Sequence, residues 1–140
     1  MEVRQARTGD RASFCILKNA FLMEYGISTK DERFVAKEFR AHLRQNIFLI
    51  ATRKKQMIGY LVATVEKGRY ETAGYIEEVF VMRPYRNQKV ASRLKAKLFR
   101  VLRQRRVGLC RLDVKPNTQP KRVYEKWGFK VDKLRMVVRL

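Results

Sequence analysis

The sequence has very few of the residues from which disulfide frameworks, metal centres and low-complexity chains are built. Its 140 residues include 2 cysteines, 1 histidine, 3 prolines and 7 glycines. Cys15 and Cys110 show no metal-like spacing, so neither a disulfide framework nor a zinc site is expected. No apolar run reaches the roughly 20 residues that cross a bilayer, and residues 1–7 lack the apolar stretch of a signal peptide. We therefore expect a soluble cytoplasmic protein with no membrane contact.

Acidic residues are scarce as well. The 13 Asp and Glu stand against 33 Lys and Arg, which gives a formal net charge of +20, and residues 79–112 contain no acid. One explanation of this excess is solubility alone. The other is a field that attracts a polyanion, such as a nucleotide cofactor, RNA, a ribosome or an acidic peptide. Charge does not decide between the two.

Hydrophobic periodicity predicts one α/β domain over residues 1–140. Apolar residues that recur every three to four positions indicate helices, and short continuous or alternating apolar segments indicate strands. The expected helices cover residues 11–25, about 31–43, 90–105 and 121–127. The expected strands are residues 3–7, 47–51, 57–63, 75–82 and 109–114, with one or two closing strands within residues 129–140.

The most informative segment is residues 75–91, Y-I-E-E-V-F-V-M-R-P-Y-R-N-Q-K-V-A. It joins an apolar strand with two adjacent acids, Glu77 and Glu78, to a short polar turn and then to a basic helix that begins at Val90. Unpaired backbone N–H groups and the helix dipole favour phosphate at a helix N-terminus. The layout therefore suits a protein that holds an anionic cofactor next to an acid–base group.

Three segments in one order carry a resemblance to a known family. The first is Y-I-E-E-V-F-V followed by R-P-Y-R, and the second is residues 86–91, in the place of an R-x-x-G-x-G/A motif. The third is residues 117–129, N-T-Q-P-K-R-V-Y-E-K-W-G-F, which matches N-x-x-A-x-x-x-Y-x-K-x-G-F. The chain thereby resembles the GNAT superfamily of acyl-CoA-dependent N-acetyltransferases. The resemblance implies a mixed, mostly antiparallel sheet of about 6–7 strands flanked by about 4 helices.

The chain departs from the family pattern at two positions. Lys89 replaces the first glycine of the phosphate loop, and Pro120 replaces a small residue of the later helix. Glycine in such loops permits unusual torsions or close backbone approach. If Lys89 takes an ordinary helical torsion in the first turn, the loop keeps its shape and the ammonium contacts a phosphate. Alternatively, its side chain fills the space that the pyrophosphate needs. The compatible residues Arg86 and Ala91 favour retained binding.

The resemblance also implies a binding site for acetyl-CoA as cosubstrate. Backbone groups of the strand would pair with the pantetheine arm, backbone amides of the loop would hold the pyrophosphate, and an amide side chain near the last helix would contact the pantetheine or cap its own helix. The strand residues are Val79, Phe80 and Val81, the loop residues are Arg86, Asn87, Gln88, Lys89, Val90 and Ala91, and the amide is Asn117.

Amine acetylation requires a base for the attacking amine and an acid for the departing thiolate. Glu77 is the first choice for the base and Glu78 the second, because neighbouring strand residues face opposite sides unless the strand bulges. Either acid is alternatively a strand residue paired with a cation. By the resemblance Tyr124 is the general acid, and its alternative role is packing beside Trp127. His42 is expected at the surface, and the two cysteines as small core residues.

These observations predict an enzyme that transfers the acetyl group of acetyl-CoA to an amine by direct attack. The field of +20 disfavours a polycationic amine and favours a peptide or protein amine, or an amine on RNA or a ribosome. The alternative is a catalytically degenerate GNAT-like module that binds nucleic acid or a protein partner through its basic surface. The resemblance also makes a homodimer an expectation.

Overall fold

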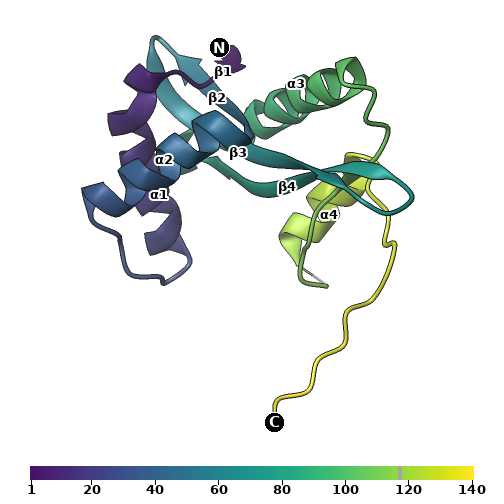
Figure 1. The fold of residues 1–140 in the computed structure, drawn as a ribbon. Coiled ribbons are helices and arrows are strands. Elements are labelled where there is room, and N and C mark those ends of the chain that lie inside the picture. Colours follow the sequence, from purple (N-terminus) through teal and green to yellow (C-terminus); the bar gives the residue numbers. More distant parts are fainter. Residues whose placement is uncertain (117) are drawn as a thin grey trace.

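The computed structural model describes residues 1–116 and 118–140 (Figure 1). Two helices follow the first strand, three strands come next, and a long helix, a short strand and a last helix complete the order. The strands are β1 (Glu2–Gln5), β2 (Ile47–Arg53), β3 (Gln56–Lys67), β4 (Thr72–Val81) and β5 (Cys110–Arg111). The helices are α1 (Arg11–Glu24), α2 (Glu32–Gln45), α3 (Val90–Gln104) and α4 (Gln119–Lys126), with short 3-10 turns at Thr8–Asp10 and Arg83–Tyr85.

The sheet has the order β1-β2-β3-β4-β5. Its first four strands pair antiparallel, whereas β5 pairs parallel to β4 because α3 carries the chain back across the sheet. The hairpin between β2 and β3 turns at Lys54 and Lys55, whose φ angles of 50° and 64° suit a two-residue turn. The expected α/β fold with a mostly antiparallel sheet is confirmed.

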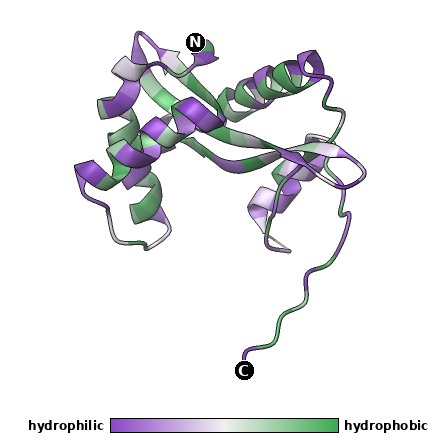
Figure 2. Cartoon of the chain, viewed as in Figure 1, coloured by the Kyte–Doolittle hydropathy of each residue, from purple (hydrophilic) through white to green (hydrophobic). Residues whose placement is uncertain are grey.

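Each face of the sheet has its own hydrophobic core. On one face, α3 presents a buried stripe of Val90, Leu94, Leu98 and Leu102, which is the stripe that the helical period predicts. On the other face, α1 and α2 cover an aromatic cluster, in which the rings of Phe14, Phe39, Phe48 and Tyr60 meet edge to face. In Figure 2 the hydrophobic residues accordingly run through the central strands and the facing sides of the helices.

The expected number of strands was wrong, because the described residues form five strands and none of them lies in residues 129–140. The strand expected over residues 109–114 is also reduced to the two residues of β5. A strand forms only where a neighbouring edge accepts its backbone hydrogen bonds. Residues 130–140 are extended and exposed, and they run away from the sheet (Figure 1).

Candidate active site

A bulge in the middle of β4 sets the position of the two adjacent acids. Val62 of β3 pairs with Glu78, but Ala63 pairs with Ile76, so Glu77 is the extra residue of β4. Bulges turn side chains and interrupt pairing, and they often lie beside active sites. Glu77 is exposed here, whereas Glu78 is half-buried on the face that α1 and α2 cover. The bulge therefore gives the two carboxylates different surroundings.

Past the bulge, β4 and β5 separate. Among the described residues, β5 pairs with β4 at only two positions, Gly74 with Cys110 and Tyr75 with Arg111. The second half of β4 therefore has no strand against its β5 side, and Figure 1 shows α4 lying beyond that side. A sheet edge of this kind presents unpaired backbone groups to an extended ligand.

The free edge presents both backbone groups of Val79 and the N–H of Val81, because the carbonyl oxygen of Val81 accepts a hydrogen bond from Arg86. Met82 donates its N–H to the carbonyl oxygen of Ile58 on β3 at 2.9 Å, and successive strand residues direct their backbone groups to opposite edges. The backbone groups of Phe80 therefore face β3, and its side chain is buried in the aromatic core. Of the three strand residues predicted for the pantetheine arm, Val79 directs both backbone groups to this edge, Val81 offers its N–H there, and Phe80 faces β3.

The loop before α3 contains two left-handed residues, Asn87 with φ of 63° and Lys89 with φ of 65°. Lys89 is the residue that caps the N-terminus of α3, and its ψ of 18° places it in the left-handed helical region. Lys89 therefore does not have the ordinary helical torsion that one of the two alternatives required. The loop keeps the conformation that glycine adopts without strain, and the lysine bears that strain.

We expect Lys89→Gly to raise the free energy of unfolding by about 1 kcal/mol, because glycine relieves the left-handed strain. The matched control is Lys97→Gly in the middle of α3, which removes the same charge and should lower the free energy of unfolding by about 1 kcal/mol. Denaturant unfolding of both variants measures the two values. A lower free energy of unfolding in Lys89→Gly would contradict the claim that Lys89 is strained.

Arg86 connects the loop to the end of α1. Its Nε donates to the carbonyl oxygen of Val81 at 2.9 Å, and its two terminal nitrogens donate to the carboxylate of Glu24 at 2.8 and 2.6 Å. Arg83 donates to the same carboxylate at 2.9 Å. These hydrogen bonds from Arg86, followed by those from Arg83, lower the pKa of Glu24 to about 2. The guanidinium predicted for the pyrophosphate is thus held by a carboxylate.

We expect Glu24→Gln to tighten acetyl-CoA binding by about threefold to tenfold, because Arg86 and Arg83 then keep a free charge for a phosphate. The gain should shrink as salt rises. Calorimetric titration at low and physiological salt measures it, with Glu71→Gln as a control that changes the net charge equally at an exposed turn. Equal effects of the two variants on the affinity would contradict a local competition between Glu24 and the phosphate for Arg86.

The gain in affinity from Glu24→Gln should not vary between pH 5 and 8, because the lowered pKa keeps Glu24 ionised at every pH above about 4.5.

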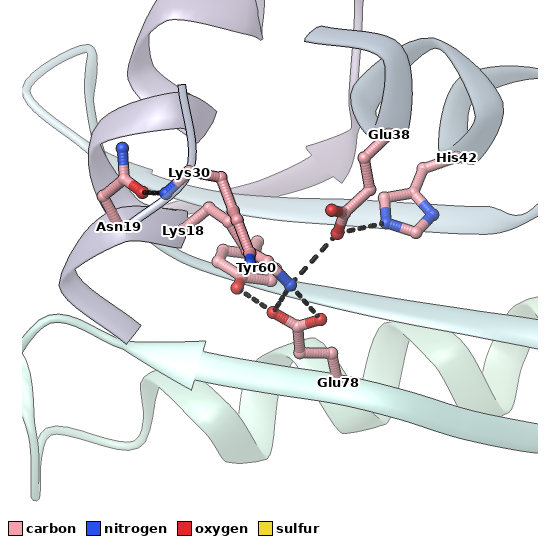
Figure 3. Close-up of polar contacts among 7 residues, drawn as sticks. All are labelled: Lys18, Asn19, Lys30, Glu38, His42, Tyr60 and Glu78. Atoms are coloured by element: carbon pink, nitrogen blue, oxygen red, sulfur yellow. Dashed lines mark hydrogen bonds and ion pairs between the residues drawn. The ribbon is translucent and has the colours of Figure 1, made fainter. Parts of the chain in front are cut away.

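Glu78 belongs to a polar network between the sheet and the first two helices (Figure 3). The ammonium of Lys18 lies 2.8 and 2.9 Å from the two carboxylate oxygens of Glu78 and 3.0 Å from Glu38. The hydroxyl of Tyr60 donates to Glu78, and His42 lies 3.3 Å from Glu38. Lys18 is only 8% exposed, so two carboxylates satisfy a buried cation.

The pKa values of the network follow from burial and pairing. Burial lowers the pKa of Lys18, but the hydrogen bonds and charges of Glu78 and Glu38 outweigh it, and the pKa lies above its ordinary value. The hydrogen bond from His42 and the contact with Lys18 lower the pKa of Glu38. Burial, followed by the charge of Glu78, raises the pKa of Tyr60 far above its usual range. All three shifts keep Lys18 and Glu38 charged and Tyr60 neutral around pH 7.

The other expected catalytic residue, Tyr124, lies on α4 and is half-buried. Its ring packs 5.4 Å from that of Trp127 and 6.1 Å from that of Phe129. Burial, and then the nearby Tyr25 at the end of α1, raise the pKa of Tyr124 above its ordinary value of 10. The hydroxyl is therefore protonated at neutral pH. Asn117 lies outside the described residues.

The sequence did not reveal several residues of this region. Lys18 is the clearest case, although it stands on the apolar stripe of α1 with Phe14, Leu17 and Phe21, where a lysine signals a buried partner. Tyr60 and Glu24 gave no such signal, because their partners lie 18 and 62 positions away in the sequence. Glu38 lies four positions before its partner His42, so the helical spacing of this pair was visible in the sequence. His42 was expected at the surface, but its side chain is 12% exposed and packs against Phe14 and Phe48. Its aromatic neighbours come from other elements, which the pattern of α2 does not show.

Two kinds of site are missing from the part of the chain that the structure describes. No group of three or more His, Cys, Asp or Glu residues is arranged to hold a metal ion there. Among the same residues, no helix combines the length and the apolar character needed to span a membrane.

The model of the acetyltransferase (GNAT) family matches residues 14–129. The chain therefore belongs to this family of acetyl-CoA-dependent acetyltransferases, and acetyl-CoA is its cosubstrate. The match includes the bulged strand β4, the loop before α3 and the helix that bears Tyr124. The resemblance drawn from the sequence is confirmed.

Solved structures share the fold at low sequence identity. A possible acetyltransferase from Clostridium difficile 630 has a TM-score of 0.84 at 19% identity, over 99% of this chain and 96% of that one. A ribosomal-protein-alanine N-acetyltransferase from Brucella melitensis biovar Abortus 2308 has a TM-score of 0.82 at 16% identity, over 100% of both chains. The aminoglycoside N-acetyltransferase AAC(6')-Iy, in complex with CoA, has a TM-score of 0.84 at 18% identity, over 99% of this chain and 93% of that one. A search of curated proteins finds no match to this sequence.

Proposed function

We propose that the protein transfers the acetyl group of acetyl-CoA to the amine of a peptide or protein, by direct attack and without a covalent enzyme intermediate. The observation that carries this proposal is the free edge of β4, which leads from the exposed carboxylate of Glu77 to the left-handed loop at the start of α3. The pantetheine arm pairs with the backbone groups of Val79 and the N–H of Val81, and the amides of the loop bind the pyrophosphate. This arrangement aligns the thioester beside the bulge.

In this proposal Glu77 and Tyr124 move the two protons of the reaction. Glu77 accepts the proton of the amine, directly or through a water molecule, as the nitrogen attacks the thioester carbonyl. Tyr124 donates its proton to the sulfur as the carbon–sulfur bond breaks. Glu78 is less suited to the role of base, because Lys18 and Tyr60 already occupy its carboxylate. In this proposal Glu78 holds the side chains of Lys18 and Tyr60 beside the bulge.

The choice of a peptide or protein amine rests on charge and shape. The chain between α1 and α2 exposes the apolar side chains of Tyr25 and Ile27, and Tyr25 lies close to Tyr124. The exposed carboxylate of Glu77 gives the bulge of a strongly basic molecule a local negative charge, which suits a single ammonium group. The fold shared with a ribosomal-protein-alanine N-acetyltransferase supports the same class of acceptor.

A cytoplasmic location fits the two free cysteines.

A comparison of Glu77→Gln with Glu78→Gln tests the proposed base. We expect Glu77→Gln to lower kcat by about 10²-fold and leave the free energy of unfolding almost unchanged, because the side chain is exposed. Glu78→Gln should lower the free energy of unfolding by about 3 kcal/mol, because it removes one of the two carboxylates that are paired with the buried ammonium of Lys18. Release of CoA thiol in the presence of a peptide with a free N-terminus gives the rates. Unchanged turnover in Glu77→Gln would transfer the role of base to Glu78.

A second acceptor class remains distinguishable, since the acid-free residues 79–112 include the basic helix α3. If the acceptor amine is carried on RNA or a ribosome, or if the chain is a degenerate binding module, affinity for RNA should fall steeply between low and physiological salt. A flat response to salt would remove both alternatives. The degenerate module also predicts no affinity for acetyl-CoA.

A further inference from the structure

β1 forms one outer edge of the sheet, at the opposite end from β5 (Figure 1). Among the described residues it pairs only with β2. Ala6 donates its N–H to the carbonyl oxygen of Phe48 on β2 at 2.8 Å, and successive strand residues direct their backbone groups to opposite sides. Val3 and Gln5 therefore direct theirs away from β2, and the carbonyl oxygen of Gln5 accepts a hydrogen bond from Arg4 at 3.1 Å. Within the described part of the chain, both backbone groups of Val3 and the N–H of Gln5 remain for an added strand.

A groove of about 410 Å³ lies beside the β1 edge, between the sheet and one flank of α3. Its apolar lining consists of Val3, Ile47 and Leu49 from the sheet and Val101 from α3. Val3 and Val101 are only partly buried against the core that α3 covers, so each keeps apolar surface in the groove. An extended segment on the β1 edge would cover this surface with the side chains of one of its faces.

Two cations line the same groove on either side of Val101 in the sequence, Lys97 and Arg105. Neither takes part in an ion pair between the described residues, and residues 79–112 contain no acid. The acid of β1, Glu2, alternates to the other face of that strand and lies 3.6 Å from Arg4. The groove therefore combines apolar surface with positive charge, which is complementary to an acidic ligand with apolar side chains.

The row of Lys97, Val101 and Arg105 has nearly the spacing of a β-strand. Four residues of a helix advance about 6 Å, and alternate residues of a strand lie about 6.6 Å apart. We propose that the β1 edge and this flank of α3 bind an extended acidic segment of a partner protein, which adds to the sheet as a further strand. An acidic, an apolar and a second acidic side chain, at alternate positions of that segment, lie opposite the row.

The β1 edge favours a peptide over a nucleic acid as the occupant of this groove. Phosphates would pair with Lys97 and Arg105 alone, whereas a peptide also uses the backbone groups of Val3 and Gln5 and covers the apolar lining. The groove lies at the opposite end of the sheet from the edge of β4 that is proposed for acetyl-CoA. Binding of the segment therefore does not depend on the proposed acetyl transfer.

Fluorescence anisotropy of a dye-labelled peptide tests the proposal on the full chain, free of nucleic acid. The probe contains Glu-Thr-Val-Thr-Glu, and its control of equal composition contains Thr-Glu-Val-Glu-Thr, in which both acids lie on the other face of the strand. We expect the probe to bind at least about fivefold more tightly, because only the probe places both acids opposite Lys97 and Arg105. Its affinity should fall as salt rises. Equal affinities of the two peptides, or no binding of either, would overturn the proposal.

Gln5→Pro tests the backbone pairing, with Gln5→Ala as its matched control. Proline removes the outward N–H of residue 5, and an edge strand tolerates this because that N–H makes no hydrogen bond to β2. We expect Gln5→Pro to raise the dissociation constant of the probe about tenfold, and Gln5→Ala to change it by less than about twofold. Equal effects of the two variants would show that the peptide does not add to the edge, and would overturn the proposal.

Hydrogen exchange of the native chain gives a second measurement of this pairing that requires no substitution. The amides of Val3 and Gln5 should become protected when the probe is added, because they donate to its backbone. Unchanged exchange at both amides under saturating probe would also overturn the proposal.

Lys97→Glu combined with Arg105→Glu tests the charge of the groove. The matched control is Lys95→Glu combined with Arg103→Glu, which changes the net charge equally on another flank of α3. We expect the first pair to raise the dissociation constant of the probe about 30-fold, and the control pair to raise it about threefold or less at physiological salt. Equal effects of the two pairs would reduce the groove to part of a general basic surface and overturn the proposal.

A short oligouridylate distinguishes the peptide site from a phosphate site. We expect it to bind more weakly than the probe at physiological salt, and Gln5→Pro to leave its affinity unchanged. If the oligouridylate binds more tightly than the probe and displaces it from the groove, the occupant is a nucleic acid and the proposal fails.

Discussion

Tyr124→Phe should lower kcat by about 10²- to 10³-fold and leave the affinity for acetyl-CoA within about threefold of the native value. The substitution removes only the hydroxyl, so the ring still packs on Trp127 and Phe129. The loss falls on kcat because the proton reaches the sulfur only as the thioester breaks. Release of CoA thiol with a peptide that has a free N-terminus measures the rate, and calorimetric titration measures the affinity.

Tyr70→Phe is the control for this variant, because Tyr70 is 91% exposed in the turn between β3 and β4. It should have native activity. Since the pKa of Tyr124 lies above 10, the native rate should show no loss from tyrosine ionisation up to about pH 9. If Tyr124→Phe and Glu77→Gln both retain native turnover on a true acceptor, the proposed mechanism fails.

Lys18→Met should lower the free energy of unfolding by about 3–5 kcal/mol, because it leaves Glu38 and Glu78 close together without the cation between them. The size of the expected effect follows from burial, since Lys18 is only 8% exposed. Urea unfolding followed by circular dichroism measures it. Lys37→Met, at an exposed position of α2, removes the same charge and should change the free energy by less than about 1 kcal/mol.

The stabilisation by this network also has a predictable pH range. The raised pKa of Lys18 gives stability that is present below its ordinary value of 10.5 and is lost as the pH rises through the folded value. The lowered pKa of Glu38 gives stability that is present above 4.5 and is lost as the pH falls through the folded value. The difference between native protein and Lys18→Met should therefore be greatest between about pH 5 and 10. A difference that peaks below pH 4 would contradict the pairing.

Local patterns predicted most of the fold. The stripe of α3 follows from the helical period, and the turn at Lys54 and Lys55 follows from two short apolar segments on either side. The chain departs from its pattern at residues 129–140, where the alternation is typical of a strand but the described sheet supplies no partner. Alternation specifies which face of a segment is apolar, but pairing depends on an edge elsewhere in the molecule or in a second copy.

The candidate site was predictable only where it is local. The adjacent acids of β4 and the loop before α3 lie in one continuous segment, so their order was visible in the sequence. The clamp of Glu24 on Arg86 and the pairing of Lys18 with Glu78 each join residues about 60 positions apart, and no local pattern indicates them. The left-handed torsion of Lys89 was missed because lysine rarely adopts it.

The central claim is that this chain binds acetyl-CoA in a loop whose glycine is replaced by Lys89. Calorimetric titration of purified, nucleic-acid-free protein with acetyl-CoA, with Lys89→Gly in parallel, tests it most directly. We predict micromolar binding by the native protein, because the left-handed loop conformation is retained despite the lysine. Absence of binding by the native protein, with binding restored by Lys89→Gly, would contradict the claim and support a role without catalysis.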